Sequence, residues 1–432
     1  MNIRNNRFFK TTYILGSALS IASAMLIVVY LYVKIADIYP ENDRSDIYIL
    51  ENCNQRDSIG SCTYGSRAHI GLAISDRLLE AIRPIATEVS IERIGWDTFE
   101  VEPDDGSIPF GMVGRMVDDA YFRIFHFELM AGRLYDSVDV ESGRPIAVIS
   151  DLLARRLYGS VEAAIGRELS MNYETYTVCG VVREPSFLMQ QSFGQVFVPN
   201  TAYGYSPSDL DWLKGEAVGN LKLRVRVSDA EAGRKMTEAV GEVLRAYSAQ
   251  RVMNEDRLLG STLTLDVLPI TSQSLGMPAD FDWGEVFRRY GFMILILLIV
   301  PALNLSGMIA GNMETRLPEM GVRKSFGARR GRLFRSVLAE NFRLTAIGGI
   351  IGLAVAALFV WGWRDWMFFL DDSIMANAPD SVSVIITSDM LFAPLVFIIA
   401  FLITFLLNFL AAMIPVWMSL RNPIVESLSE SK

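Results

Sequence analysis

The sequence predicts an α-helical membrane protein with four transmembrane helices and one large α+β domain outside the membrane. Hydrophobic residues make up 51% of the 432 residues, and the mean hydropathy of +0.28 is high for a soluble enzyme. Four stretches without a charged residue are long enough to cross about 30 Å of hydrocarbon. The long segment between the first two stretches instead mixes strand-like and helix-like patterns, as a folded domain does.

The first apolar stretch lies between Lys10 and Lys34 and predicts a transmembrane helix over residues 11–33, after a cytoplasmic N-terminus over residues 1–10. A cleaved signal peptide is the alternative, because the small residues at 22–24 offer a cleavage site. The apolar run continues well past that site through "MLIVVYLYV". We therefore expect an uncleaved anchor.

Residues 35–288 form the predicted outer domain. Its segment "RPIAVIS" predicts a buried strand whose last residue, Ser150, caps the helix "DLLARRLYG" that stops at Gly159. The segments "YTVCGVV" and "NLKLRVRV" carry β-branched residues in strand-like patterns. Residues 229–248 place apolar side chains on one helical face. The domain is therefore predicted to be a mixed α+β unit.

Two of the three cysteines lie close together in this domain. Cys53 and Cys62 belong to a stretch rich in glycine, serine and asparagine, on the side of the membrane where disulfides persist. We therefore expect a disulfide between them. Cys179 lies on a predicted strand and is expected to be a buried thiol.

No sequence motif predicts catalysis, a bound metal or a bound cofactor. The sequence lacks the G-x-S-x-G, H-E-x-x-H and G-x-x-x-x-G-K-[ST] patterns of hydrolases, metalloproteases and P-loop ATPases. His69 and His126 have no second histidine or cysteine one helical turn away, so we expect no metal site. The acidic segment "DFDWGE" suits a solvated approach to the second span better than an acid/base pair. A net charge of −9 argues against nucleic acid as a partner.

The other three apolar stretches predict transmembrane helices over residues 290–312, 340–363 and 390–418. The connector over residues 313–337 is rich in arginine and lysine, whereas the charged residues of the loop over residues 364–389 are mostly acidic. Basic loops stay in the cytoplasm. We therefore expect the connector, the N-terminus and the C-terminal residues 419–432 in the cytoplasm.

Small residues recur at every fourth position in two of the spans, where helices can approach closely. They are Gly16, Ser20 and Ala24 in the first span and Gly348 and Gly352 in the third. Dimerisation with a second copy and packing within one chain are equal alternatives for these stripes.

The connector contains a short amphipathic segment. Gly321 and Gly327 bracket "VRKSF", in which Val322 and Phe326 are four residues apart and so share one helical face. A short helix across the membrane surface is expected. It would rest either on lipid headgroups or in the groove of a partner protein.

Four segments carry a family resemblance. They are "RLPEMGVRKSFGARRGRLFRSVLAEN" in the connector, "FHFELMAGRLYDSVDVESGRPIAVISDLLARRLYG" and "ETYTVCGVVRE" in the outer domain, and "IPVWMSLRNPIVESL" near the C-terminus. The first resembles the R-x-x-E-[IM]-G-[IV]-[RK]-[KR]-x-[FL]-G-A signature of ABC-transporter permeases of the macrolide-exporter (MacB-like) and FtsX-like superfamily. The others resemble that superfamily's periplasmic core and closing tail, so the resemblance covers the whole chain.

This resemblance implies that the connector is a coupling helix that docks on a separate ATPase subunit. The docking residues that it implies are Arg316, Glu319, Gly321, Val322, Arg323, Lys324, Phe326, Gly327 and Ala328. Pro318 and Ser325 depart from the signature, but a proline suits the first turn of a helix. Neither change disables docking on physical grounds. The outer domain is expected to be of the Porter-like type with an inserted second lobe.

The resemblance implies the permease subunit of an ABC transporter in the bacterial inner membrane, with its large domain in the periplasm. A cytoplasmic ABC ATPase dimer would bind ATP and Mg, so this chain would hold no cofactor and would not itself be an enzyme. Mechanotransmission would then drive efflux or extraction of a substrate that the sequence does not name. The alternative is an FtsX-like signalling or regulatory protein that controls an extracytoplasmic partner.

Three other kinds of partner are expected from the resemblance. A second permease copy or a sister permease would complete the transporter, membrane lipid would surround it, and a periplasmic or outer-membrane protein could join it outside. The sequence does not distinguish a homodimer from a heterodimer.

Overall fold

The computed structural model describes residues 3–56, 69–94, 98–103, 106–202, 217–253, 262–276 and 330–369, with isolated residues between 284 and 413. The chain divides into two compact units. The helical unit comprises Met1–Val33, Asp282–Met367 and Ile386–Lys432, and the outer unit comprises Lys34–Phe281 and Phe368–Ile385.

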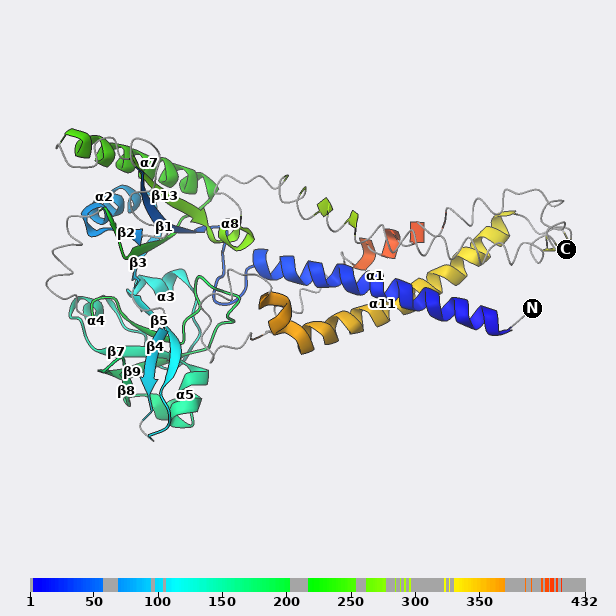
Figure 1. Cartoon of the computed structure of the whole chain (residues 1–432), viewed down its shortest axis with the longest axis horizontal. Helices are drawn as coiled ribbons and strands as arrows, with labels where there is room; N and C mark the ends of the chain where they lie inside the picture. Colours follow the sequence, from blue (N-terminus) through cyan, green and yellow to red (C-terminus); the bar gives the residue numbers. More distant parts are fainter. Residues whose placement is uncertain are drawn as a thin grey trace. The chain divides into compact units, whose positions relative to one another are not determined.

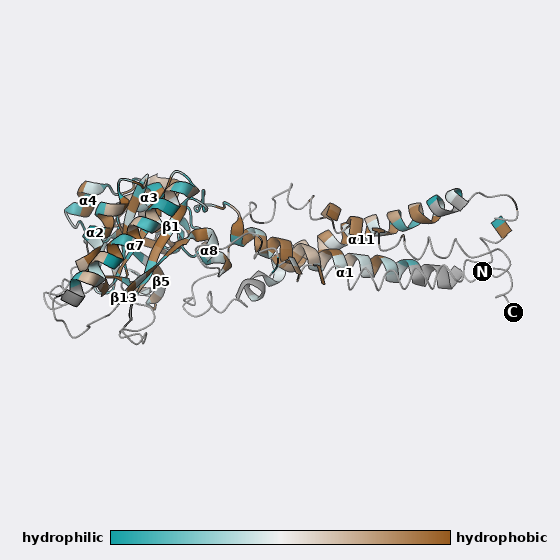
Figure 2. Cartoon of the chain, turned by 90° about the horizontal axis from the view of Figure 1, so that it is seen from above, coloured by the Kyte–Doolittle hydropathy of each residue, from teal (hydrophilic) through white to brown (hydrophobic). Residues whose placement is uncertain are grey.

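Two long helices form the described part of the helical unit, α1 (Ile3–Ile35) and α11 (Arg330–Phe369). They are long and apolar enough to cross a membrane over Lys10–Ile35 and Arg335–Trp363. These ranges match the first and third predicted spans, and hydrophobic residues cover much of α11 (Figure 2). Helix α11 is interrupted at Trp363, whose φ of −128° and ψ of 27° are not helical. The predicted spans over residues 290–312 and 390–418 lie largely outside the described residues.

The outer unit is built on one mixed sheet, which joins thirteen strands in the part of the chain that the structure describes. The strands are β1 Ile47–Arg56, β2 His69–Ile70, β3 Glu88–Arg93, β4 Thr98–Glu102, β5 Phe110–Val117, β6 Leu129–Gly132, β7 Ile146–Ser150, β8 Glu168–Met171, β9 Glu174–Val182, β10 Val196–Pro199, β11 Val218–Gly219, β12 Leu221–Arg226 and β13 Thr262–Pro269. Its helices are α2 Leu72–Ile82, α3 Ala120–Ile124, α4 Ser137–Glu141, α5 Asp151–Tyr158, α7 Ala230–Met253 and α8 Ile270–Leu275, with a short 3-10 helix at Glu162–Ala164.

One part of this sheet closes into a barrel. Strands β10, β7, β9, β8, β4 and β5 pair in that order, and β5 returns to pair with β10 in parallel, with Arg115 opposite Phe197. Buried side chains from these strands and from α5 fill its core, among them Phe99, Met112 and Tyr176. Closure leaves these strands without an unpaired edge between them.

The sheet continues from β5 through β3, β12, β1 and β13, which we call the open limb. Helices α2 and α7 cover one face of it, and α3 packs against β3 and β12 (Figure 1). Because side chains alternate along a strand, Leu223 and Val225 of β12 face the core beneath α2 and α7. Arg224, between them, faces the α3 side instead.

The local sequence signals of the outer domain are confirmed. Strand β7 ends at Ser150, whose side chain accepts a hydrogen bond from the Leu153 amide and caps α5. Helix α5 ends at Gly159, which has a φ of 82° in the left-handed region that glycine adopts readily. The segments "YTVCGVV" and "NLKLRVRV" form most of β9 and β12. The predicted helix over 229–248 is α7, with Met236 and Val240 buried.

Candidate docking segment, helix contact and polar core

The connector presents exposed apolar side chains at the predicted positions. The Phe326 amide donates to the Val322 carbonyl at 3.1 Å, which is the spacing of one helical turn. Val322 is 48% exposed and Phe326 87% exposed, and Arg323 beside them is also exposed. The other predicted docking residues, Arg316, Glu319, Gly321, Lys324, Gly327 and Ala328, lie outside the described residues. The docking role therefore stays a prediction.

The small residues of the third span pack against the first span of the same chain. A Cβ atom added to Gly348 would lie 2.9 Å from the Ile14 carbonyl oxygen, and one added to Gly352 would lie 2.5 Å from the Ala18 carbonyl oxygen. Two backbones can approach this closely only where side chains are absent. Ser20 and Ala24 of the first stripe are buried and Gly16 is partly exposed. The structure thus shows the packing alternative for Gly348 and Gly352, while dimerisation remains a prediction.

Polar contacts extend this helix pair toward the connector. Lys10 Nζ lies 3.3 Å from Glu340 Oε1, and the hydroxyls of Tyr13 and Thr345 are 2.9 Å apart. The Thr345 hydroxyl also donates to the carbonyl of Asn341 in its own helix at 2.9 Å. From these polar contacts to the glycine contacts, the residue numbers increase in α1 and in α11 alike. Helices α1 and α11 therefore run parallel, as Figure 1 also shows.

A polar core lies on the α3 side of the open limb. Arg224 Nη1 contacts Glu92 Oε2, and Arg115 Nη1 lies 2.7 Å from Glu92 Oε1. Arg224 and Glu92 are almost completely buried. The Arg224 guanidinium also stands 5.3 Å from the centroid of the Tyr121 ring, within range of a cation–π contact.

Charge pairing sets the ionisation of Glu92. Burial alone would raise its pKa, but the positive charges of Arg224, Arg115 and Lys222 hold the pKa at about 2. Glu92 is therefore ionised at neutral pH. This site was not predicted from the sequence, because Lys222, Arg224 and Arg226 alternate with apolar residues as they would on a solvated strand face. The available signal was Arg224 itself, an arginine on a strand face that a second helix, α3, covers.

A second carboxyl, the partly buried Asp118, follows the last residue of β5. Its side chain accepts hydrogen bonds from Ser90 Oγ at 2.7 Å, the Ile91 amide at 2.8 Å and the Tyr121 amide at 3.2 Å. Burial nevertheless raises the pKa of Asp118 to about 6, because none of its hydrogen-bond donors is charged. This carboxyl thus gains a proton more easily than a solvated aspartate.

The predicted disulfide finds no support at Cys53, which is a free thiol in the structure. Strand β1 has a register shift between Glu51 and Asn54, with Asn52 at a φ of 54°. The shift turns Cys53 into the core beneath α2 and α7, where its Sγ lies 3.6 Å from the Ala217 carbonyl oxygen. Burial raises the pKa of this thiol to about 12. Cys62 lies outside the described residues.

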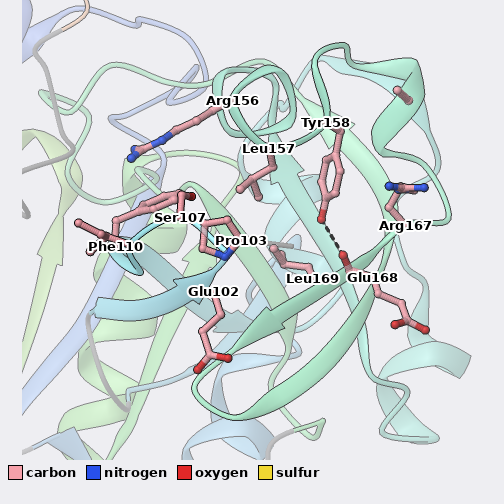
Figure 3. A pocket seen from close by; sticks show the side chains of 12 residues that line it. Glu102, Pro103, Ser107, Phe110, Arg156, Leu157, Tyr158, Arg167, Glu168 and Leu169 are labelled. Carbon is pink, nitrogen blue, oxygen red and sulfur yellow. Dashed lines mark hydrogen bonds between the residues drawn. The ribbon is translucent and has the colours of Figure 1, made fainter. Parts of the chain in front are cut away.

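A pocket of about 710 Å³ opens at one end of the barrel, between the β4–β5 hairpin and α5. Leu157 and Leu169 form part of its apolar lining, and the Tyr158 hydroxyl donates to the Glu168 carbonyl at 2.8 Å (Figure 3). Its charges are balanced, since two arginines and two glutamates line it. The formal charges of the lining side chains therefore sum to zero. Among the described residues, no three acidic, histidine or cysteine side chains group as metal ligands would.

Two family models match the chain. The MacB-like periplasmic core domain matches residues 11–243, and the FtsX-like permease C-terminal region matches residues 291–424. The second match includes the connector, α11 and the predicted second and fourth spans.

Individual relatives agree with these matches. The macrolide export ATP-binding/permease protein MacB of Neisseria gonorrhoeae is 24% identical over 56% of this chain and 34% of that protein. The uncharacterized ABC transporter permease YknZ of Bacillus subtilis is 22% identical over 55% of this chain and 55% of that protein. The chain thus spans about a third of the length of this MacB and about half that of YknZ.

Two solved structures are similar to part of this chain. The periplasmic region of MacB from Actinobacillus actinomycetemcomitans has a TM-score of 0.34 at 16% identity, over 51% of this chain and 88% of that chain. A domain of a putative permease from Porphyromonas gingivalis has a TM-score of 0.38 at 16% identity, over 54% of this chain and 92% of that chain.

Proposed function

Because the chain belongs to the family with a MacB-like periplasmic core domain and is an ABC transporter permease, we propose that it couples ATP binding on a separate ATPase to movement of its outer domain. The ATPase would be a cytoplasmic dimer that holds ATP and Mg. Its closure would push the connector, and α11 would carry that movement into the membrane. Export or extraction of a substrate would follow outside.

The observation that carries this proposal is the exposed helical turn of the connector. Val322 and Phe326 offer two apolar anchors on one face, in a segment whose sequence is rich in arginine. Apolar anchors with a charged rim suit the groove of a protein partner. Helix α11 begins at Arg330, four residues after Phe326, so this turn is close in sequence to a helix that is long and apolar enough to cross a membrane.

The helix pair supports the proposed four-span topology. Since α1 and α11 run parallel, both must start on the same side of the membrane. The chain between them must then cross an odd number of times. The apolar stretch over residues 290–312 is the crossing that the sequence provides, and a fourth span over 390–418 would return the C-terminus to the cytoplasm.

A second permease copy or a sister permease is the remaining proposed subunit. The Gly348 and Gly352 stripe is occupied by α1, so the second subunit would use another face. Ile350 and Leu358 of α11 are more than 60% exposed and belong to such a face. The same face would otherwise contact lipid.

Affinity purification of the tagged full chain tests the docking role. We expect a P-loop ATPase to copurify with the parent protein and to be lost from the double variant Glu319→Lys, Arg323→Glu. The control is Glu238→Lys, Arg245→Glu, which makes the same charge changes on the exposed face of α7 and should retain the ATPase. Absence of an ATPase from the parent preparation would refute the transporter function.

A further inference from the structure

Arg44 connects the two chain ends of the outer domain. It is 2% exposed, and its Nη1 donates to the carbonyl of Ala36 at 3.3 Å. Ala36 directly follows α1, which ends at Ile35. Arg44 Nη2 donates to the Ser274 hydroxyl at 2.9 Å. Ser274 lies in α8, the last described helix before the predicted second span.

Glu41 holds this arginine and also fixes a loop of the sheet. Its Oε2 lies 2.9 Å from Arg44 Nε in a fully buried ion pair. Its Oε1 accepts hydrogen bonds from the Gln191 amide at 3.1 Å, the Ser192 amide at 3.0 Å and the Ser192 hydroxyl at 2.9 Å. Both of these residues belong to the loop over residues 183–195, between β9 and β10.

The other side of this loop is tied to the polar core. Arg115 of β5 donates to the Gln190 carbonyl at 2.6 Å, and Arg224 of β12 donates to the Gln191 carbonyl at 3.0 Å. Strand β5 belongs to the barrel and β12 to the open limb. A displacement of the loop would therefore act on both parts of the sheet.

We propose that Arg44, held by Glu41, is a positioning residue that ties the end of α1 and helix α8 to the β9–β10 loop, and so passes movement of α1 to both parts of the sheet. This proposal rests on the transport function proposed above. Within it, α11 moves α1 through their close contact, and Arg44, with its partner Glu41, is a buried side chain shortly beyond α1 that gathers the separate segments.

The chemistry of the contact suits this role. A guanidinium presents five donors in a planar fork, so one side chain can donate to the Ala36 carbonyl and the Ser274 hydroxyl in fixed directions while its charge pairs with Glu41. An ammonium instead carries its three donors on one freely rotating atom at the end of a flexible stem. Buried ion pairs contribute little net stability compared with apolar packing. Their strength in low dielectric instead resists relative displacement of the groups that they hold.

The test variant is Arg44→Lys, which keeps the charge beside Glu41 but loses the fork. Its matched control is Arg155→Lys, at an exposed arginine 3.7 Å from Asp151 on α5. Hydrogen exchange is measured on the full chain in lipid nanodiscs. We expect amides of residues 274–276 to exchange at least about tenfold faster in Arg44→Lys, since charged hydrogen bonds are lost. Amides of β7 and β9 should be unchanged, and the control should match the parent.

The second measurement follows the outer domain in the complex with the copurified ATPase. Spin labels at Tyr173→Cys on the barrel and Glu242→Cys on α7, both exposed positions, report one distance before and after addition of ATP and vanadate. We expect a distance change in the parent and in Arg155→Lys, and at most about a tenth of that change in Arg44→Lys, which still binds the ATPase. Ser274→Ala should reduce the change, and Ser274→Thr, which keeps the hydroxyl, should restore it.

The outcomes separate the two proposals. A full distance change in Arg44→Lys would overturn the role of Arg44 while leaving the transport function intact. No distance change in the parent protein would overturn both. Unchanged exchange at residues 274–276 in Arg44→Lys would show that Arg44 does not tie the ends of the domain, whatever the ATPase does.

Discussion

The α1–α11 contact and the polar core both hold distant parts of the chain together, but with opposite chemistry. In the helix pair, Gly348 and Gly352 let the backbones touch, and the described ion pair, Lys10–Glu340, lies at the end near the connector. In the polar core, Glu92 and Arg224 are buried as charges. Lipid offers no solvation for a misplaced charge, so membrane helices use small residues and hydroxyls. A domain that folds in water can bury charges if it pairs them.

The largest expected effect lies in the polar core. We expect Arg224→Met to lower the free energy of unfolding by about 3 kcal/mol or more, because Glu92 loses one of its buried partners. The exposed Arg155, which pairs with the partly buried Asp151, gives the control, and Arg155→Met should cost less than about 1 kcal/mol. Urea unfolding of the full chain in detergent, followed by tryptophan fluorescence, measures both. Equal losses would contradict the importance that we give to burial.

Changing the pH tests the comparison further, because the outer domain carries a partly buried carboxyl whose pKa is raised. Asp118 has a pKa of about 6 in the folded protein, above its ordinary value of 3.8. The folded state therefore holds this proton more tightly than the unfolded state. Its contribution to stability is complete below about pH 4 and is lost as the pH rises through 6. The loss amounts to about 3 kcal/mol.

The measurement for Asp118 is the free energy of unfolding between pH 4 and pH 7, for the parent and for Asp118→Asn. Subtracting the two curves removes the contributions of other carboxyl groups. We expect the stability advantage of the parent to shrink as the pH rises. Parallel curves would mean that Asp118 does not titrate in this range.

Smaller changes in stability are expected from two glycine-to-alanine substitutions in α11, and the two changes should differ in direction. Gly348→Ala adds a methyl group against the Ile14 carbonyl and should destabilise the contact by about 1–3 kcal/mol. Gly362 lies in the same helix with open space at its Cβ position, so Gly362→Ala should be neutral or slightly stabilising. Thermal unfolding in detergent compares them. A loss in both variants would point to helix backbone effects instead of close packing.

The two regions also differ in how far the sequence predicts them. Apolar length and four-residue spacing of small residues are local patterns, and they predicted α1, α11 and the glycine positions of their contact. The β7–α5 unit was predicted from its cap at Ser150 and its stop at Gly159 for the same reason. The docking residues of the connector were predicted from a contiguous motif, and only Val322, Arg323 and Phe326 among them are described.

The polar core could not be predicted, because its members come from distant positions that meet only in the folded sheet. Glu92 and Arg224 lie on neighbouring strands, and the sequence around each residue alternates between polar and apolar side chains, as in a strand with one exposed face. Barrel closure depends on the parallel pairing of β5 with β10, which no local pattern specifies. The bulge that turns Cys53 inward cannot be predicted from the alternation of β1 either. The predicted disulfide depended on proximity in sequence, on a stretch rich in small polar residues and on the side of the membrane, none of which specifies where a side chain points.

The burial of Cys53 has a practical consequence for spectroscopic work on this protein. Only a thiolate reacts appreciably with maleimide or methanethiosulfonate reagents. A pKa of about 12 in place of 9 lowers the thiolate fraction near neutral pH about a thousandfold. Cys179, whose pKa burial raises to about 11, is slowed in the same way. Replacing Cys62 alone should therefore give a background in which an introduced surface cysteine is labelled selectively.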